Sequence, residues 1–531
     1  MISQINFDKK KLIIIFSIIV FLFAFFIRIF YISQKVGIHI DEGFTHVISN
    51  FNGYQWDIPF AKDKIYTGRE LRDLTFKNNT NLKEALQDVI RLRKNNNNDT
   101  CHCTLYNSIY LLWTQGGGGV LSPHEFIAKG CSLNLLFFIL EFFIMFKILQ
   151  RLFPDSYVII TGLAFAFLNT GSISNTLFIR PYQLQELSFV LLTYVFINIF
   201  EKLNKRENII NIKNGIFIVL SIAFTILTGY FAILYTAILG LILVFVCLKN
   251  KLYKNLLFLL GCLGSAAILI FAFYPGFLNG FTSMRAGETF DNASFKSGMC
   301  VFRIIHSLIF YFSNVISYLI YMPLILLMIL AVYQKKDKYN KSALLLVSGS
   351  IIYSIIVMCI APFKVLRYIV PIFPVMSIVL PMLIYGAKDF AKKLLSAGSI
   401  LLLVIYAVSP YSTVEYTIVS PYKFFRAKIQ NINDTEYEKF KFIQKTELPV
   451  IIINNSTYSC YLNLIFNMPD NQKYEFLDSI NKIPQNYNHY FLLFERKYSN
   501  SKIENINLPK NYEVVDRFNP ARFEGYELVR K

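Results

Sequence analysis

Long apolar runs separated by short basic segments fill most of the chain before residue 411. The runs hold roughly 18 to 25 residues, the length that a helix needs to cross a bilayer. Backbone groups inside lipid must bond within their own segment, so these runs should be helical. The pattern predicts an all-α polytopic membrane protein with about eleven transmembrane helices. We place them near residues 11–32, 126–148, 154–173, 182–200, 214–231, 232–248, 254–273, 311–332, 342–361, 367–386 and 396–411.

The Lys and Arg residues support this arrangement, because cytoplasmic loops carry an excess of positive charge. With the N-terminus inside, every segment that alternate threading places on the inner side is basic. The net charge of +19 then reflects topology and the anionic inner leaflet, and we expect no nucleic-acid partner. The protein is predicted to be a multi-pass protein of the inner or plasma membrane with a cytoplasmic N-terminus.

Three long segments fall on the outer side: a loop at 33–125, a second loop at 274–310, and the polar tail. Within the first loop, Leu82–Leu92 and Leu105–Trp113 are amphipathic or apolar stretches too short to span. We expect a transmembrane module over 1–411, including the loop 33–125, and a small extracytoplasmic (periplasmic) α/β domain over 412–531. Its predicted elements are a helix at Asp434–Lys445, strands at Val450–Ile453 and Tyr490–Phe494, and a closing pair at Tyr512–Phe518 and Gly525–Val529.

Two charged side chains fall inside predicted spans. Arg28 lies near the outer end of the first span and is expected to extend to the interface. Glu141 lies about seven residues, or roughly 10 Å, from the inner end of the second span. We therefore expect Glu141 to lie at the wrong depth to pair with Arg28 or with a group on the outer side.

Two adjacent carboxylates, Asp41 and Glu42, follow the outer end of the first span. A carboxylate at this interface can act as a base towards a hydroxyl or amine acceptor. Adjacent side chains diverge, so we expect one of the two to be the base and the other to orient it or to bind a cation. Hard oxygen ligands of this kind would suit a divalent cation such as Mg or Mn.

Cationic residues also gather at outer ends of spans. Arg180-Pro181-Tyr182 opens the fourth span, where Pro181 suits the first helical turn. Lys364 and Arg367 lie on the outer side against the positive-inside trend, which suits an anionic ligand such as a lipid phosphate. Arg285 in the second outer segment is a further candidate of the same kind.

Cysteine and histidine chemistry gives weaker signals. Cys101-His102-Cys103 would crowd as contiguous zinc ligands, and no second ligand pair follows at the usual spacing. A disulfide among Cys101, Cys103, Cys300 and Cys460 is open, because sequence cannot give the pairing.

These motifs, in this order, resemble those of the GT-C superfamily. Its members are polytopic glycosyltransferases that use polyprenyl-phosphate sugars, such as protein O-mannosyltransferases and the aminoarabinose transferase of lipid A. Asp41-Glu42 matches an acidic pair of the first outer loop, and His102 to Tyr106 matches a His-Pro-Pro-Leu-Tyr stretch with both prolines replaced. Arg180-Pro181-Tyr182 agrees with an Arg-Pro-Tyr motif in every residue type.

Three further motifs extend the resemblance over roughly residues 10–400. An acidic-aromatic lead-in followed by a basic residue opens the second span. A Thr-His-Tyr motif ends the fifth span and has lost its His here. An Arg-Tyr motif followed by prolines opens a late span. The matching residues are Glu125-Phe126 and Lys129, Thr228-Gly229-Tyr230, and Arg367-Tyr368 with Pro371 and Pro374.

The resemblance implies an inverting transfer of a sugar from a polyprenyl-phosphate donor to a lipid, glycan or protein acceptor outside the membrane. Asp41 would be the base and Glu42 its helper, and some relatives use a divalent cation. The remaining motif residues would bind the donor phosphate (Arg180, Lys364, Arg367, Arg285) or the substrates (His102, Tyr106, Tyr182, Tyr368).

Two other classes of function stay open. A transporter or flippase for a lipid-linked or anionic solute would need ionisable residues near the bilayer midplane in broken helices, and Glu141 alone fits. A non-catalytic scaffold would tolerate alanine at Asp41, Arg180 and Arg367.

Overall fold

The computed structural model divides the chain into two compact units. The first unit combines Met1–Ser33, Asp99–Tyr106 and Cys131–Gln430, and the second combines Gln34–Asn98, Asn107–Gly130 and Asn431–Lys531. The described residues are 7–50, 64–75, 77–78, 82–95, 105–114, 119–120, 122–293, 305, 340–362, 366–387, 389–408, 440–445, 447–453, 461–484, 486–495, 511–518 and 523–531.

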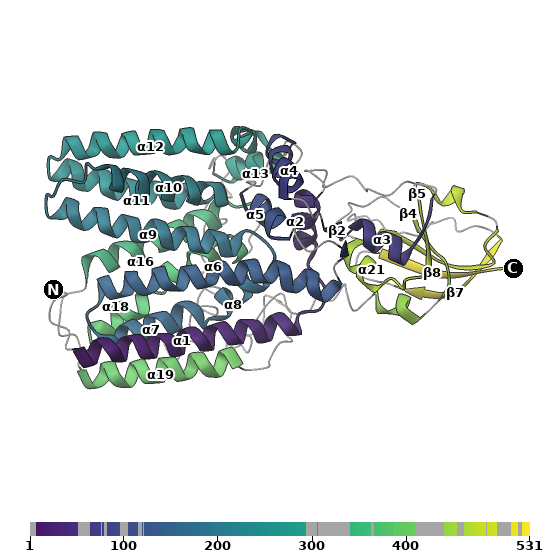
Figure 1. Cartoon of the computed structure of the whole chain (residues 1–531), viewed down its shortest axis with the longest axis horizontal. Helices are drawn as coiled ribbons and strands as arrows, with labels where there is room; N and C mark the ends of the chain where they lie inside the picture. Colours follow the sequence, from purple (N-terminus) through teal and green to yellow (C-terminus); the bar gives the residue numbers. More distant parts are fainter. Residues whose placement is uncertain are drawn as a thin grey trace. The chain divides into compact units, whose positions relative to one another are not determined.

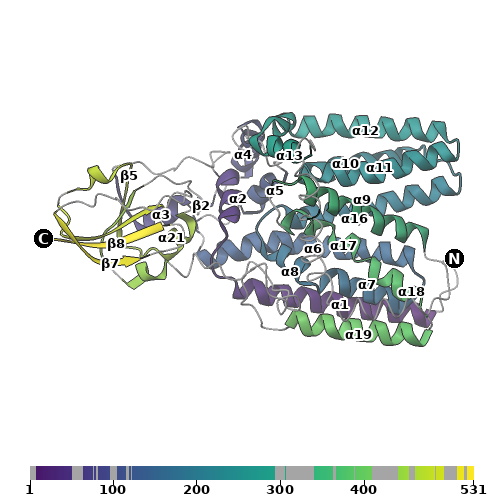
Figure 2. The ribbon, with the colours of Figure 1, turned by 180° about the vertical axis from the view of Figure 1, so that it is seen from behind.

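The first unit is a bundle of helices that run side by side (Figure 1), and the view from behind shows the same arrangement (Figure 2). Its helix α13 lies at the opposite end of the bundle from the start of α1. The helices are α1 (Phe7–Gln34), α6 (Pro123–Leu152), α7 (Ser156–Phe167), α8 (Thr170–Leu177), α9 (Tyr182–Asn204), α10 (Ile212–Thr228), α11 (Ala232–Lys249), α12 (Tyr253–Phe273), α13 (Met284–Ala293), α16 (Lys341–Ile360), α17 (Phe373–Met376), α18 (Val379–Tyr385) and α19 (Asp389–Val408), with short 3-10 turns η2 (Phe277–Thr282), η3 (Leu366–Tyr368) and η4 (Val370–Ile372).

The expected polytopic helical class is confirmed, whereas the count of about eleven spans is not. Six helices of the described chain are long and apolar enough to cross a membrane, or seven if the bent pair α7 and α8 counts as one span. The span expected at 311–332 lies outside the described residues. The region expected as one span at 367–386 is instead a series of short helices that contains Pro371, Pro374 and Pro381. Proline removes a backbone donor, which interrupts a continuous helix.

The span expected at 154–173 is also broken, because α7 and α8 meet at an angle of 48°. The side chain of Asn169 caps both helices at the break. Its Nδ2 donates to the carbonyls of Phe165 and Ala166 (2.9 and 2.8 Å), and its Oδ1 accepts the N–H of Ser172 at 2.9 Å. Backbone groups that a bent helix leaves unpaired are therefore bonded by a local side chain.

Arg28 from α1 fills the same break. Its guanidinium donates to the Phe167 carbonyl at 3.0 Å, to Ser172 Oγ at 2.8 Å and to Thr176 Oγ1 at 3.0 Å. The side chain has 0% exposure and lies over the Phe138 ring, 3.9 Å from its centroid. The expectation that Arg28 extends to the interface is therefore wrong, since the carbonyl end of α7 and the hydroxyls of α8 bind it inside the bundle.

Glu141, expected to lie at the wrong depth to pair with Arg28, is connected to it through the side chains of Thr176 and Gln183. Gln183 Nε2 donates to Oε2 of Glu141 at 2.8 Å and to Oε2 of Glu186 at 2.9 Å. Gln183 Oε1 accepts from Thr176 Oγ1, which also accepts from Arg28. One buried network therefore joins a guanidinium to two carboxylates, all with 0% exposure.

The second unit is built around a six-stranded sheet of order β1-β5-β4-β6-β8-β7. The central strand β4 is buried throughout and runs parallel to β5 and β6, whereas the outer pairs are antiparallel. A continuous apolar run is typical of a strand covered on both faces. The strands are β1 (Ile65–Thr67), β4 (Val450–Ile453), β5 (Lys473–Leu477), β6 (His489–Glu495), β7 (Tyr512–Phe518) and β8 (Phe523–Arg530).

The helices of this unit come from both ends of the chain. They are α2 (Ile40–Asn50), α3 (Gly68–Thr75), α4 (Leu82–Asn95), α5 (Leu105–Thr114), the first turns of α6, and α21 (Leu462–Asn467), with the 3-10 turns η6 (Lys441–Lys445) and η8 (Ile480–Lys482). A separate small pair, β2 (Lys77–Asn78) and β3 (Gly119–Val120), also belongs to the outer loop. The helix expected at Asp434–Lys445 is described only from residue 440, where it forms the short turn η6.

The first outer loop and the tail form one sheet, unlike the expected division at 411/412. Strand β1 pairs with β5 antiparallel, with Ile65 opposite Glu475. The N–H of Gly68 donates to the Gln472 carbonyl at 3.0 Å, and Arg72 pairs with Asp470. The edge of β5 thus obtains its backbone partners from a strand about 400 residues earlier in the chain, as an exposed edge requires.

We expect Arg28→Met to lower the free energy of unfolding by about 1–3 kcal/mol for each buried acceptor that loses its donor, namely the Phe167 carbonyl and the hydroxyls of Ser172 and Thr176. Thermal unfolding of the purified protein would measure this. Arg151→Met is the matched control. Its 2.8 Å pair with Glu201 is 30% exposed on each side and should contribute at most about 1 kcal/mol. Equal losses in the two variants would contradict a stabilising role of the buried hydrogen bonds of Arg28.

We expect Gly68→Ala to separate the first loop from the tail, because a Cβ there would collide with the Pro469 carbonyl. The cost should be about 1–3 kcal/mol, seen as earlier proteolytic cleavage within the first outer loop. The matched control is Gly287→Ala on α13, where a Cβ meets no atom within 4 Å. Unchanged cleavage in Gly68→Ala would show that this contact does not join the two segments.

Candidate functional site

The acidic pair opens α2, where the two carboxylates diverge. Glu42 is buried at 1% exposure and forms an ion pair with Lys35, which is equally buried. Its second oxygen accepts the backbone N–H of His39 at 2.7 Å, so Glu42 also caps the helix that contains it. An ion pair away from water requires such full hydrogen bonding to offset the cost of desolvation. Glu42 therefore fixes the start of α2.

Asp41 is 17% exposed, compared with 1% for Glu42. Its backbone N–H donates to Nδ1 of His39 at 3.1 Å, and Oδ2 lies 3.5 Å from the same nitrogen. Because Nδ1 accepts the Asp41 N–H, the neutral imidazole of His39 has its proton on Nε2. Asp41 is thus the member of the pair whose carboxylate reaches solvent.

The middle of α2 is held by buried contacts of the second unit. His46 Nε2 lies 2.8 Å from the Thr75 carbonyl, which can only accept, so this nitrogen carries the proton. Burial lowers the pKa of His46 to about 4, and the imidazole is neutral at physiological pH. Its ring meets Phe126 edge-on at 4.9 Å between centroids. These contacts make α2 a fixed support for Asp41.

A divalent cation at Asp41 and Glu42 does not fit this arrangement, because Glu42 is bonded to an ammonium and a backbone N–H. No group of three or more His, Cys, Asp or Glu in the described part of the chain could hold a metal ion. A requirement for Mg or Mn stays a prediction.

In the first unit, Arg180 lies in the turn between α8 and α9 and is buried. Asn134 from α6 fixes this turn, since its Nδ2 donates to the carbonyls of Phe178 (2.6 Å) and Thr176 (3.3 Å). Tyr106, expected to bind substrate, donates its hydroxyl to Asn134 Oδ1 at 3.1 Å and is 1% exposed. In the structure Tyr106 thus supports the turn that carries Arg180.

The other candidate residues of the first unit lie on or beside α9, η3 and α13. Tyr182 stacks on Phe178 with centroids 5.8 Å apart. Arg367 is half-buried on η3, beside the Tyr368 ring, and the following turn η4 packs against α8 and α9. Arg285 on α13 forms a 3.0 Å pair with Glu288.

The acidic pair belongs to the second unit and Arg180, Arg285 and Arg367 to the first, so their convergence stays a prediction. Lys364, His102 and the four outer cysteines lie outside the described residues.

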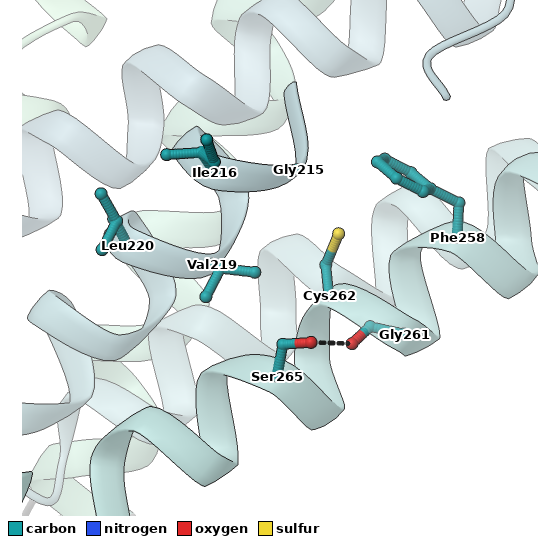
Figure 3. Close-up of a pocket in the computed structure, with 8 residues that line it drawn as sticks. All are labelled: Gly215, Ile216, Val219, Leu220, Phe258, Gly261, Cys262 and Ser265. Atoms are coloured by element: carbon teal, nitrogen blue, oxygen red, sulfur yellow. Dashed lines mark hydrogen bonds between the residues drawn. The ribbon is translucent and has the colours of Figure 1, made fainter. Parts of the chain in front are cut away.

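A shallow groove of about 500 Å³ lies between α10 and α12 (Figure 3). Its lining includes Ile216, Leu220 and Phe258, and the Ser265 hydroxyl donates to the Gly261 carbonyl at 3.0 Å. Without a charged side chain it offers nothing for phosphate or proton transfer, and it suits a lipid-facing surface.

Sequence reasoning missed Lys35 and Asn463, which bond the segment around the acidic pair, and Glu186, which belongs to the buried network of Arg28. Lys35 could have been found, since it is a cation just outside the first span, against the charge trend. Glu186 could also have been found, because it lies in the predicted fourth span and a carboxylate inside a span needs a polar partner. Asn463 carries no sequence signal.

No protein-family model and no curated protein matches the chain. Among solved structures, ArnT from Cupriavidus metallidurans bound to undecaprenyl phosphate is similar, with a TM-score of 0.50 and 11% sequence identity. The likeness covers 97% of this chain and 98% of that one. The same ArnT in its apo state gives a TM-score of 0.48 at 12% identity, covering 98% of each chain. The protein therefore has an ArnT-like fold, which agrees with the fold that the motif resemblance predicted.

We expect Glu42→Gln and Lys35→Met each to cost about 3–5 kcal/mol of stability, because each leaves one buried charge alone. The double variant should cost less than the sum, and a double-mutant cycle of thermal unfolding measures the difference. The half-exposed pair Arg285–Glu288 is the control and should show a coupling of at most about 1 kcal/mol. Strictly additive effects at Lys35 and Glu42 would rule out a coupled pair.

Proposed function

We propose that the protein is an inverting glycosyltransferase that moves a sugar from a polyprenyl-phosphate donor to an acceptor on the outer face of the cell membrane. The observation that carries the proposal is the different environment of the two adjacent carboxylates. Glu42 is neutralised by Lys35, while Asp41 keeps an accessible carboxylate on a fixed helix. The fold similarity to ArnT bound to undecaprenyl phosphate supports the donor class.

In the proposed reaction, Asp41 removes the proton from the acceptor hydroxyl or amine as that atom attacks the anomeric carbon. The bond between this carbon and the phosphate oxygen breaks, and the electron pair leaves with the polyprenyl phosphate. Attack from the side opposite the leaving group inverts the anomeric centre. A positioned base of this kind typically accelerates a reaction by about 10²–10⁴-fold.

The leaving phosphate needs cations, for which we propose Arg180, Arg367, Lys364 and Arg285. Arginine suits this task because its planar group can donate two parallel hydrogen bonds to phosphate. Tyr182 and Tyr368, each beside one of these arginines, are proposed to contact the donor, as is His102, whereas Tyr106 acts through Asn134. The proposal places the N-terminus in the cytoplasm and the tail outside.

One observation favours a transporter or flippase as the alternative. The bent pair α7 and α8 and the network of Arg28, Glu141 and Glu186 are features that transporters use near the midplane. Oε1 of each carboxylate is buried with no hydrogen-bond partner in the described chain. The network is sealed from solvent, however, which favours a structural role.

We expect Asp41→Asn to reduce transfer by about 10²–10⁴-fold while the protein still inserts normally. Mass spectrometry of lipid-linked sugars and surface glycans, in cells lacking the protein and complemented with each variant, measures this. Accumulation of the donor identifies the sugar, and the missing product identifies the acceptor. Asp88→Asn is the matched control, because Asp88 lies in the same loop with 15% exposure.

Full transfer by Asp41→Asn would refute the assignment of the base. Uptake of lipid-linked sugar by vesicles containing the wild-type protein, without any transfer product, would favour the transporter instead.

A further inference from the structure

The helix α21 holds the chain just before the acidic pair. Asn463 accepts the backbone N–H of Ile38 through Oδ1 at 2.9 Å and donates from Nδ2 to the carbonyl of the same residue at 2.6 Å. Both residues are buried, at 4% and 1% exposure. An asparagine amide has a donor and an acceptor side by side, so one side chain satisfies both polar groups of one backbone residue.

The same face of α21 also supports α2 indirectly, through Phe126. Phe466, three residues after Asn463, packs on Phe126 with ring centroids 5.6 Å apart. Phe126 in turn meets His46 of α2. Residues three apart on a helix lie on one face, so the same face of α21 bonds Ile38 ahead of α2 and, through Phe126, supports His46 in the middle of α2.

The position of α21 is itself fixed within the second unit. Asn467 donates to the Asn463 carbonyl at 2.8 Å, and Gln444 donates to Asn467 Oδ1 at 2.8 Å. The backbone and a side chain around Met468 and Asp470 bind α3 of the first loop. A contact from α21 to Ile38 therefore connects the backbone before Asp41 to the sheet.

We propose that Asn463 is a positioning residue for Asp41. This inference rests on the proposed function of Asp41 as the base. Asn463 holds Ile38, and Glu42 holds the N–H of His39, so two successive residues ahead of the helix are fixed. Asp41 follows two residues later, in the first turn. The C-terminal segment thus builds the candidate active site instead of only covering it.

Loss of the two hydrogen bonds between Asn463 and Ile38 should move Asp41 without unfolding the second unit. Asn463→Ala removes both bonds, and Asn463→Asp keeps the size and the acceptor but loses the donor. A displacement of about 1 Å at a reacting group can reduce a rate by roughly 10²-fold. We therefore expect turnover to fall about 10- to 100-fold in Asn463→Ala, and at least as far in Asn463→Asp, where a carboxylate oxygen would face the Ile38 carbonyl.

Hydrogen exchange on the full-length protein in lipid nanodiscs tests the position directly and needs no substrate. Exchange of the peptide covering residues 38–44 should be about tenfold faster in Asn463→Ala. Gln472→Ala is the matched control. Gln472 is buried to the same 4%, and its side chain bonds the Leu448 carbonyl, just ahead of strands β5 and β4. It should leave the exchange of residues 38–44 unchanged.

Turnover is measured with a lipid extract from cells lacking the protein, titrated as the source of donor. We expect Asn463→Ala to lower the maximal rate while the half-saturating amount of extract stays the same. A purely structural role would lower the amount of folded enzyme equally in Asn463→Ala and Gln472→Ala, and this result would overturn the proposal. Unchanged exchange at residues 38–44 would also overturn it.

The two proposals fail in different ways. If Asp41→Asn retains activity in the same assay, the function of Asp41 is refuted, whereas the exchange result still reports whether Asn463 holds Ile38. If Asp41→Asn is inactive but Asn463→Ala matches the wild type in exchange and turnover, only the positioning role is refuted.

Discussion

Polar groups that leave water must find partners within the protein, and this constraint shapes both units of the chain. In the helix bundle, the break between α7 and α8 exposes backbone carbonyls, which Asn169 and Arg28 bind. Arg28 is connected through Thr176 to Gln183, whose amide is shared by the carboxyl groups of Glu141 and Glu186. In the second unit, Lys35 and Glu42 are buried together as an ion pair. Each buried charge thus determines where its neighbours can lie.

This constraint also separates the roles of two adjacent acids. A lone buried carboxylate would be costly, so Glu42 needs Lys35 and a backbone N–H, and these bonds orient the first turn of α2. Asp41, one residue earlier, is turned away from the pair by the helical geometry. A base must be accessible and fixed at the same time. The first condition is met by exposure and the second by the groups that hold Glu42 and Ile38.

Several elements could be read directly from local pattern. The apolar run Val450–Ile453 is strand β4, and Tyr512–Phe518 pairs with β8 as expected. Leu82–Leu92 and Leu105–Trp113 lie within helices α4 and α5. Strand β5 was missed although Lys473 to Phe476 alternate between polar and apolar residues, because this strand pattern covers only four positions. Strand β1 has only three residues, and strands this short are stable only next to their partners.

The sequence alone determined that the chain is a polytopic helical membrane protein, because hydrophobic length and loop charge are local properties. It also marked Asp41, Glu42, Arg180 and Arg367 as candidates, since their motifs are contiguous. Only the tertiary structure decided that the first loop and the tail form one sheet, that Arg28 meets Glu141 through a hydrogen-bond network, and that Asn463 holds Ile38. These contacts join residues about 100 to 400 positions apart in the chain. Such a contact depends on which buried polar groups find hydrogen-bond partners in the folded protein, and a local sequence pattern does not encode this.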